Sequence, residues 1–95
     1  MPFPKQNARA FTRANIEGIS PGQNGCYGLF VNQGGWVYVG KGDIRTRLME
    51  HLRGDNPDIT RAGPTHYVDV ITPDMDAEEK RLIVELQPSC NKKVG

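Results

Sequence analysis

The chain has 95 residues, enough to bury the core of one small domain and too few for a second. Charged residues make up 24% and hydrophobic residues 37%, a balance that indicates a globular protein rather than a disordered one. The formal net charge of +1 excludes no class of partner, so any phosphate binding has to come from a local arrangement of side chains.

No apolar run approaches the length of a membrane span, and the start, MPFPKQNARAF, lacks the apolar core of a signal peptide. We therefore expect a cytoplasmic protein with no membrane partner. Cys26 and Cys90 lie far apart without a CxxC spacing, which favours two reduced, packed thiols over a disulfide framework or a zinc site.

Residues 1–24 are rich in Pro, Asn, Gly and Arg, so we expect a loosely attached N-terminal segment. A short helix is predicted within it, near Thr12 to Gly18, before the breaker SPG. The domain itself is expected over residues 25–95.

Two strand-forming runs, residues 26–31 and 36–40, flank an NQGG stretch, and this pattern predicts a β-hairpin whose turn glycines supply positive φ. We expect Val31 to face Trp36 across the turn. Because side chains alternate along a strand, that register puts Tyr27 and Tyr38 on one face of the sheet.

Asp43 is placed to cap a helix over residues 44–53, which Gly54 would close as a left-handed residue. The buried stripe of this helix is expected to comprise Ile44, Leu48 and Leu52. Arg47 and His51 fall one turn apart at an edge of that stripe, where a side chain can lean over the core and still reach solvent.

The stretch 55–65 contains NP and GP, so we expect an irregular loop. Residues 66–72, HYVDVIT, alternate well enough for a third strand. Thr72 as cap and Pro73 at the first helical position then predict a second helix, which runs to about Leu86.

The second helix places a carboxylate inside its own apolar stripe. At about 100° per residue, Glu79 projects about 40° from Met75, between Leu86 and Ile83. Burying an unpaired carboxylate is costly, so such a residue is normally paired, protonated or bound to a metal.

Two tyrosines on one sheet face, Lys41 after the second strand, Arg47, His51 and Glu79 together fit phosphodiester hydrolysis. That reaction needs a base for the attacking water, cations around the phosphate and usually a divalent metal. Glu79 is suited to hold one Mg²⁺ whose other positions are mostly water, and Arg47 to clamp a phosphate oxygen.

An ordered set of motifs spans residues 25–91. It comprises Gly25-Cys26-Tyr27, Tyr38-Val39-Gly40, Arg47-x-x-x-His51, Glu79 and Pro88-x-x-Asn91. This set resembles the GIY-YIG nuclease domain. YVGKGDIRTRL and EKRLIVELQPSCN are likewise similar to that family's YIG-K-x-x-x-L-x-x-R-L and E-x-x-L-I-x-x-L-x-P-x-x-N, although the first motif reads GCY and the stretch after Lys41 is one residue shorter.

The resemblance implies an α+β fold with a small three-stranded antiparallel sheet flanked by helices. It also implies a DNA endonuclease that uses one divalent ion, Mg²⁺ or Mn²⁺. By the same resemblance, Tyr27 is the base or positions the water, His51 helps to take its proton, and Tyr38 forms a hydrogen bond near the attacked phosphate.

The remaining roles follow from the same resemblance. Lys41 and Arg47 balance the phosphate charge, and Glu79 binds the metal. Asn91 fixes local geometry or contacts phosphate.

Scattered basic residues are candidates for a DNA path, although each alone is ordinary surface. They are Arg45, Arg53 and Lys80, followed by Arg61, Arg81, Lys92 and Lys93. With a catalytic domain alone, we expect weak sequence preference, preference for a special DNA structure, or dependence on a targeting protein partner.

Two other interpretations stay open. A catalytically weak module that binds nucleic acid or protein on the same fold is favoured by the near-neutral charge and the shortened stretch at Lys41. A purely structural domain would instead have Glu79 paired with an arginine, well away from both tyrosines.

Overall fold

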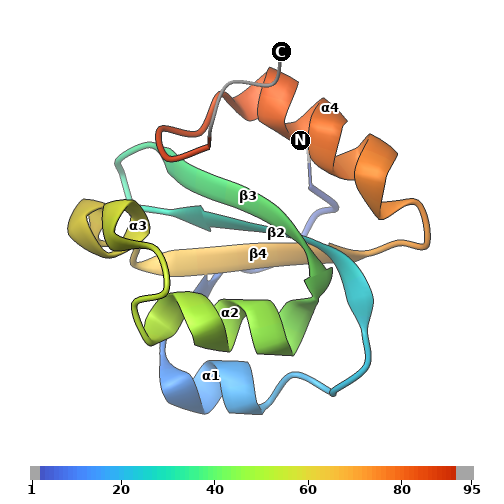
Figure 1. Cartoon of the computed structure of the whole chain (residues 1–95), viewed down its shortest axis with the longest axis horizontal. Coiled ribbons are helices and arrows are strands. Elements are labelled where there is room, and N and C mark those ends of the chain that lie inside the picture. The colour runs from blue at the N-terminus through green and yellow to red at the C-terminus, as the bar shows by residue number, and fades with distance from the viewer. Residues whose placement is uncertain (1–2, 92–95) are drawn as a thin grey trace.

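Four antiparallel strands form the centre of the structure, a computed structural model that describes residues 3–91. Their order in the sheet is β1-β4-β2-β3, with α1 and α2 on one face and α4 on the other (Figure 1). The elements in chain order are β1 Arg9–Ala10, α1 Arg13–Glu17, β2 Asn24–Phe30, β3 Trp36–Asp43, α2 Ile44–Leu52, α3 Pro57–Ala62, β4 His66–Ile71 and α4 Met75–Leu86. The fold is therefore α+β.

The sheet separates two hydrophobic clusters, because successive side chains of β2 point to opposite faces. Toward α1 and α2 the buried side chains are Ile16, Ile19, Tyr27, Leu29, Val37, Ile44, Leu48, Ile59 and Tyr67. Toward α4 they are Phe3, Cys26, Val39, Val68 and Leu82. β2 lies between β4 and β3 and contributes to both clusters.

The N-terminal segment is part of the packed fold, so the expectation of loose attachment is wrong. Phe3 and Ile16 are 3% and 0% exposed. The Gln6 side chain donates to the Asp69 carbonyl at 2.7 Å and accepts from the Asp69 amide at 3.0 Å, which ties the segment to β4. The short helix predicted near Thr12 is confirmed as α1, with the Thr12 hydroxyl as its cap.

β1 makes the sheet four-stranded, which corrects the prediction of three strands. It pairs with β4 through Arg9↔Tyr67 and Ala10↔His66. Both β1 side chains are exposed, so the strand depends on backbone pairing and carries no apolar alternation in the sequence.

The hairpin forms as predicted, but its register near the turn differs. Leu29 pairs with Tyr38 and Phe30 with Trp36, so Val37 is an extra residue in a β-bulge and the predicted Val31–Trp36 pairing is wrong. The bulge turns Trp36 to the Phe30 face, where the two rings lie 5.1 Å apart. The side chain of Tyr38 still lies on the same face of the sheet as that of Tyr27, as predicted.

The turn itself also differs from the prediction. Positive φ falls on Gln33, at 61°, rather than on Gly34 or Gly35. The amide of Gly34 donates to the Val31 carbonyl at 2.7 Å, and this bond tightens the turn around the glutamine.

Residues 57–62 form a short helix, α3, where an irregular loop was expected. The Asn56 side chain accepts from the amides of Asp58 and Ile59, and Pro57 occupies the first turn. Gly63 closes the helix at φ 66°, and Ile59 is buried against the α1–α2 cluster. NP followed six residues later by Gly is thus a start and stop signal for one short helix.

The two longer helices agree with the sequence except at one end. Asp43 caps α2 by accepting from the Thr46 amide, and Gly54 follows the helix at φ 90°. α4 begins at Met75 rather than Pro73, because the Thr72 hydroxyl accepts from the Asp74 amide and so holds a turn before the helix. Among residues 3–91, no helix combines the length and the apolar character that crossing a membrane requires.

Candidate active site

Six of the predicted site residues line one pocket of about 340 Å³. They are Tyr27, Tyr38, Lys41, Arg47, His51 and Glu79, and Asp55, Asn56 and Pro57 complete the wall. The pocket lies beside β3, which is an edge strand of the sheet. Figure 1 shows α2 on one face of the sheet and α4 on the other. Side chains from both faces can meet there because, among residues 3–91, no further strand pairs with that edge.

Gly40 makes room for the Tyr27 ring. The two residues pair across β2 and β3, and a Cβ added to Gly40 would lie 2.5 Å from Tyr27 Cζ and 2.9 Å from Tyr38 Cε2. A side chain at this position would therefore displace both rings. The glycine after the second tyrosine thus lets one phenol lie flat across the neighbouring strand.

The Tyr27 hydroxyl is buried against a histidine. Tyr27 is 1% exposed, and its oxygen lies 2.6 Å from Nε2 of His51, which is 7% exposed. Burial, followed by the neighbouring Tyr38, raises the pKa of Tyr27 well above its ordinary value of 10.0. Tyr27 is therefore a neutral phenol at physiological pH, able to donate its proton to Nε2.

Asp55 contacts the other nitrogen of the same imidazole. Its Oδ1 lies 2.8 Å from His51 Nδ1, and its side chain is 41% exposed. Asp55 is not among the site residues predicted from the sequence, because it falls beyond the end of α2. The signal available was an acidic residue four positions after a histidine, which is common on helix surfaces and therefore weak.

Tyr38 packs against both rings of this chain of hydrogen bonds. Its ring centroid lies 6.3 Å from that of Tyr27 and 5.1 Å from that of His51, edge to face with the latter. Burial, and secondarily Glu79, raises the pKa of Tyr38. A second neutral phenol therefore lines the pocket as a hydrogen-bond donor.

Glu79 reaches the pocket from α4 and pairs with a lysine rather than an arginine. Its Oε1 lies 3.5 Å from Lys41 Nζ, and its side chain is 24% exposed. Lys41 also pairs with Asp76, one turn earlier on α4, and this hydrogen bond is the main reason that the pKa of Lys41 is raised. The salt bridge lies in the same pocket as both tyrosines.

Arg47 enters from α2, and Gly42 shapes its surroundings. Gly42 has φ 126°, and a Cβ there would lie 3.2 Å from Arg47 Nε. The guanidinium pairs with Glu50 at 3.3 Å and is half exposed. A half-exposed cation thus lines the same pocket as both tyrosines.

The donor set suits a hard divalent cation held mainly by water. The part of the chain that the structure describes contains no cluster of three or more His, Cys, Asp or Glu arranged to enclose a metal. Mg²⁺ commonly takes one or two protein carboxylates and keeps several waters. Glu79, in an open pocket, meets that requirement, whereas a zinc centre with three or four protein ligands does not fit.

Asn91 lies outside this pocket and braces β3 from its free edge. Its Oδ1 accepts from the Val39 amide and its Nδ2 donates to the Val39 carbonyl, both at 2.8 Å. The amides of Ser89 and Cys90 donate to the carbonyls of Trp36 and Val37. The segment 89–91 therefore covers the edge of the strand that carries Tyr38 and Lys41.

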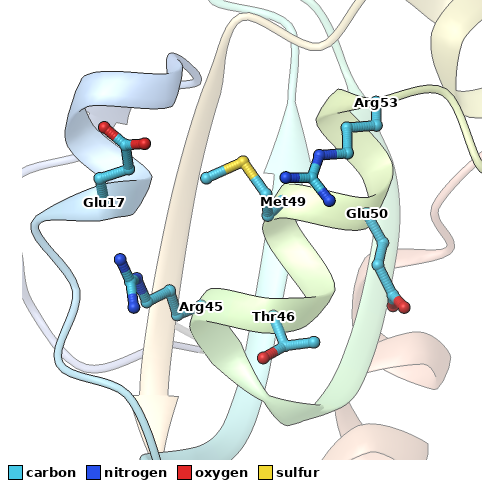
Figure 2. Close-up of a pocket in the computed structure, with 6 residues that line it drawn as sticks. All are labelled: Glu17, Arg45, Thr46, Met49, Glu50 and Arg53. Carbon is cyan, nitrogen blue, oxygen red and sulfur yellow. The ribbon is translucent and has the colours of Figure 1, made fainter.

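Within the described part of the chain, the predicted DNA-path residues are not gathered at the candidate active site. Arg45 and Arg53 line a second pocket, also about 340 Å³, between α1 and α2. Figure 2 shows Glu17 of α1 across this pocket from Arg45 and Met49 of α2. Lys80 is exposed on α4.

Of the other basic candidates, two form ion pairs and two lie outside the residues that the structure describes. Arg61 pairs with Asp58 at 3.2 Å, and Arg81 pairs with Glu78 at 2.6 Å. Lys92 and Lys93 lie outside the described residues.

Comparison of the chain with models of protein families, with curated proteins and with solved structures finds no match.

Proposed function

We propose that this protein is a metal-dependent DNA endonuclease of the GIY-YIG type. The proposal is carried by one observation: side chains from β2, β3, α2 and α4 converge on a single pocket. Within it, a buried phenol is hydrogen-bonded to a histidine beside two cations and a carboxylate. These are the groups that phosphodiester hydrolysis requires.

The raised pKa of Tyr27 decides how the phenol would act. The raised pKa excludes a preformed phenolate at neutral pH. Tyr27 can therefore accept a proton from the water only if it gives up its own phenol proton in the same step. The attacking water gives a proton to the Tyr27 oxygen while the phenol proton moves to His51 Nε2, 2.6 Å away. The water oxygen bonds to phosphorus, the bond to the leaving oxygen breaks, and that oxygen takes a proton from solvent.

The other side chains would stabilise charge around the phosphate. Arg47 donates to a non-bridging oxygen in a two-pronged contact, Lys41 supplies a second positive charge, and the neutral Tyr38 phenol donates a hydrogen bond. Glu79 would hold Mg²⁺ or Mn²⁺, which supplies positive charge for the leaving oxygen when bound.

Nicking of supercoiled plasmid tests the proposal. Wild-type protein with Mg²⁺ should convert supercoiled to open circular DNA, and Glu79→Ala should lower the rate by about 100-fold or more. Glu85→Ala is the matched control, because Glu85 lies on the same helix, pairs with Arg81 and does not line the pocket. Equal nicking by wild type and Glu79→Ala, or by neither, contradicts the proposal.

A second candidate is a nucleic-acid or protein binding module with little turnover. The Lys41–Glu79 ion pair favours it, because the lysine already balances the carboxylate that would take the metal. This candidate expects DNA binding that weakens steeply with salt and no cleavage with Mg²⁺ or Mn²⁺. Binding measured at several salt concentrations, beside the plasmid assay, separates the two.

A further inference from the structure

We propose that Asp55 is a positioning residue for the hydrolysis, which holds His51 in the tautomer that can accept the Tyr27 proton. This inference rests on the proposed function above. It assigns a role to a residue that the sequence motifs do not include.

Geometry supports a continuous chain of hydrogen bonds from the pocket interior to the surface. Tyr27 Oη lies 2.6 Å from His51 Nε2, and His51 Nδ1 lies 2.8 Å from Asp55 Oδ1. An ionised carboxylate only accepts hydrogen bonds, so the Nδ1 proton must be donated to Asp55. A neutral imidazole has one donor and one acceptor nitrogen, which leaves Nε2 free to accept from the phenol.

Backbone conformation explains how Asp55 reaches the ring. α2 ends at Leu52, and Gly54 then takes φ 90°, where a residue with a Cβ is strained. The Gly54 amide donates to the His51 carbonyl at 3.1 Å, and the Asp55 amide donates to the Glu50 carbonyl at 3.2 Å. The chain thus folds back along the last helical turn, which places the carboxylate beside Nδ1.

The charges around His51 show why the carboxylate matters. Tyr27 and Tyr38 contact the imidazole from the sheet, and both are neutral. Arg47 of α2, Lys41 of β3 and Glu79 of α4 line the same pocket. Lys41 pairs with Glu79 and Asp76, and Arg47 pairs with Glu50. Asp55 is in direct contact with the imidazole ring and would offset the charge of an imidazolium.

Protons balance along this chain. As the water proton reaches the Tyr27 oxygen and the phenol proton reaches Nε2, His51 becomes an imidazolium that still donates Nδ1–H to Asp55. Asp55 stays ionised throughout and takes no proton. When the products leave, the Nε2 proton is lost to solvent, Tyr27 keeps the proton that it took from the water, and the neutral tautomer of His51 is restored.

The test combines a tautomer measurement with kinetics. In ¹⁵N-labelled wild-type protein, the NMR shifts of the His51 ring should report a proton on Nδ1 and none on Nε2. Asp55→Asn, whose amide can donate to Nδ1, should move the population toward the Nε2–H form. It should also lower kcat for plasmid nicking by about 100-fold or more while KM changes less than about twofold.

Two further variants keep the result interpretable. Asp58→Asn removes an exposed carboxylate from α3 that pairs with Arg61, and it should change neither the tautomer nor kcat. Gly54→Ala removes no site side chain, but it strains the turn that carries Asp55 and should shift the carboxylate away from Nδ1. It should therefore reproduce the tautomer change even if Asp55→Asn folds poorly.

Failure of the inference and failure of the proposed function can be told apart. A wild-type Nε2–H tautomer, or wild-type kcat in a folded Asp55→Asn variant, overturns the role of Asp55 and leaves the nuclease assignment intact. Wild-type protein that does not nick DNA overturns both, whatever the tautomer measurement shows.

Discussion

Two pockets of about the same volume flank α2, and they differ in what their polar groups do. The pocket between α1 and α2 has arginines, glutamates and a methionine on its walls (Figure 2). The pocket beside β3 also has arginine and glutamate, together with a buried phenol and imidazole in one hydrogen-bond chain. Both pockets are therefore concave and charged, whereas a buried, hydrogen-bonded phenol and imidazole line only the pocket beside β3.

Helix periodicity separates the two pockets. At about 100° per residue, Arg45 and Arg47 point about 160° apart around α2, so neighbouring arginines serve different surfaces. His51 lies on the Arg47 side, while Met49 and Arg53 lie on the Arg45 side. Substitutions on one short helix can thus separate effects on the proposed catalysis from effects on the proposed DNA binding.

The largest expected effect comes from removing the Tyr27 hydroxyl. Tyr27→Phe should lower the plasmid nicking rate by about 1,000-fold, because the water loses its proton acceptor. It should also cost about 1–3 kcal/mol in free energy of unfolding, since His51 Nε2 stays buried without its donor. Single-turnover nicking and urea unfolding measure the two effects.

Tyr67→Phe is the matched control for this variant. Tyr67 is as buried as Tyr27 and contributes to the same hydrophobic cluster, but its hydroxyl donates to the Asn15 carbonyl at 3.4 Å, outside the pocket. It should lose stability without losing activity. A Tyr27→Phe variant that nicks DNA as fast as Tyr67→Phe would exclude Tyr27 from the proposed chemistry.

A smaller but sharp effect is expected at Gly40. Gly40→Ala puts a Cβ 2.5 Å from Tyr27 Cζ, so the ring must move, at a cost of about 1–3 kcal/mol in unfolding free energy. Gly35→Ala is the control, because a Cβ there has no atom within 4 Å. Thermal unfolding of both should show a lowered Tm for Gly40→Ala alone; equal Tm values would mean that the phenol is not confined by the strand.

Local signals in the sequence predicted much of this site. Asp43 and Gly54 bound α2 as expected, and the alternation along β2 and β3 brought both tyrosines to one face. The rotation of Glu79 into the apolar stripe of α4 correctly indicated a carboxylate that needs partners. Each of these depends on a period or a cap within about a dozen residues.

What the sequence did not predict depends on contacts without a period. The bulge at Val37 changes the register by one residue without changing the composition of the strand. β1 is held by backbone pairing. Phe3 is buried although it belongs to an N-terminal segment whose composition is mostly polar. Asp55 meets His51 because the chain reverses at Gly54 after the helix has ended, where helical periodicity no longer applies.

A moderate effect is expected at the start of α2, which supports both pockets. Asp43 accepts from the amides of Thr46 and Gly22, and the Thr46 bond is the main reason that its pKa is lowered from 3.8. Asp43→Ala should therefore cost about 1 kcal/mol in unfolding free energy at pH 7. The loss should affect the walls of both pockets, because residues of α2 line both.

The pH dependence of this effect has a definite sign. A carboxyl whose pKa is lower in the folded state contributes stability above its unfolded pKa and loses it as the pH falls through the folded value. The difference between wild type and Asp43→Ala should thus shrink below about pH 3.8. Urea unfolding at pH 7 and at pH 3 measures it, and a difference that grows on acidification would contradict the capping role of the charge.

The smallest effects are expected from the α1–α2 pocket, and they decide whether it contacts DNA. Arg45→Ala and Arg53→Ala should each weaken DNA binding a few-fold and reduce the slope of log K against log salt by about 0.9, because one phosphate contact is lost. Glu17→Gln, on the facing wall of the same pocket, should change affinity in the opposite direction. The nicking rate at saturating DNA should stay at the wild-type value in all three variants, since none of these residues lines the candidate active site. Unchanged salt slopes in both arginine variants would leave this pocket without a role in DNA binding and place the phosphate contacts on the β3 side of α2.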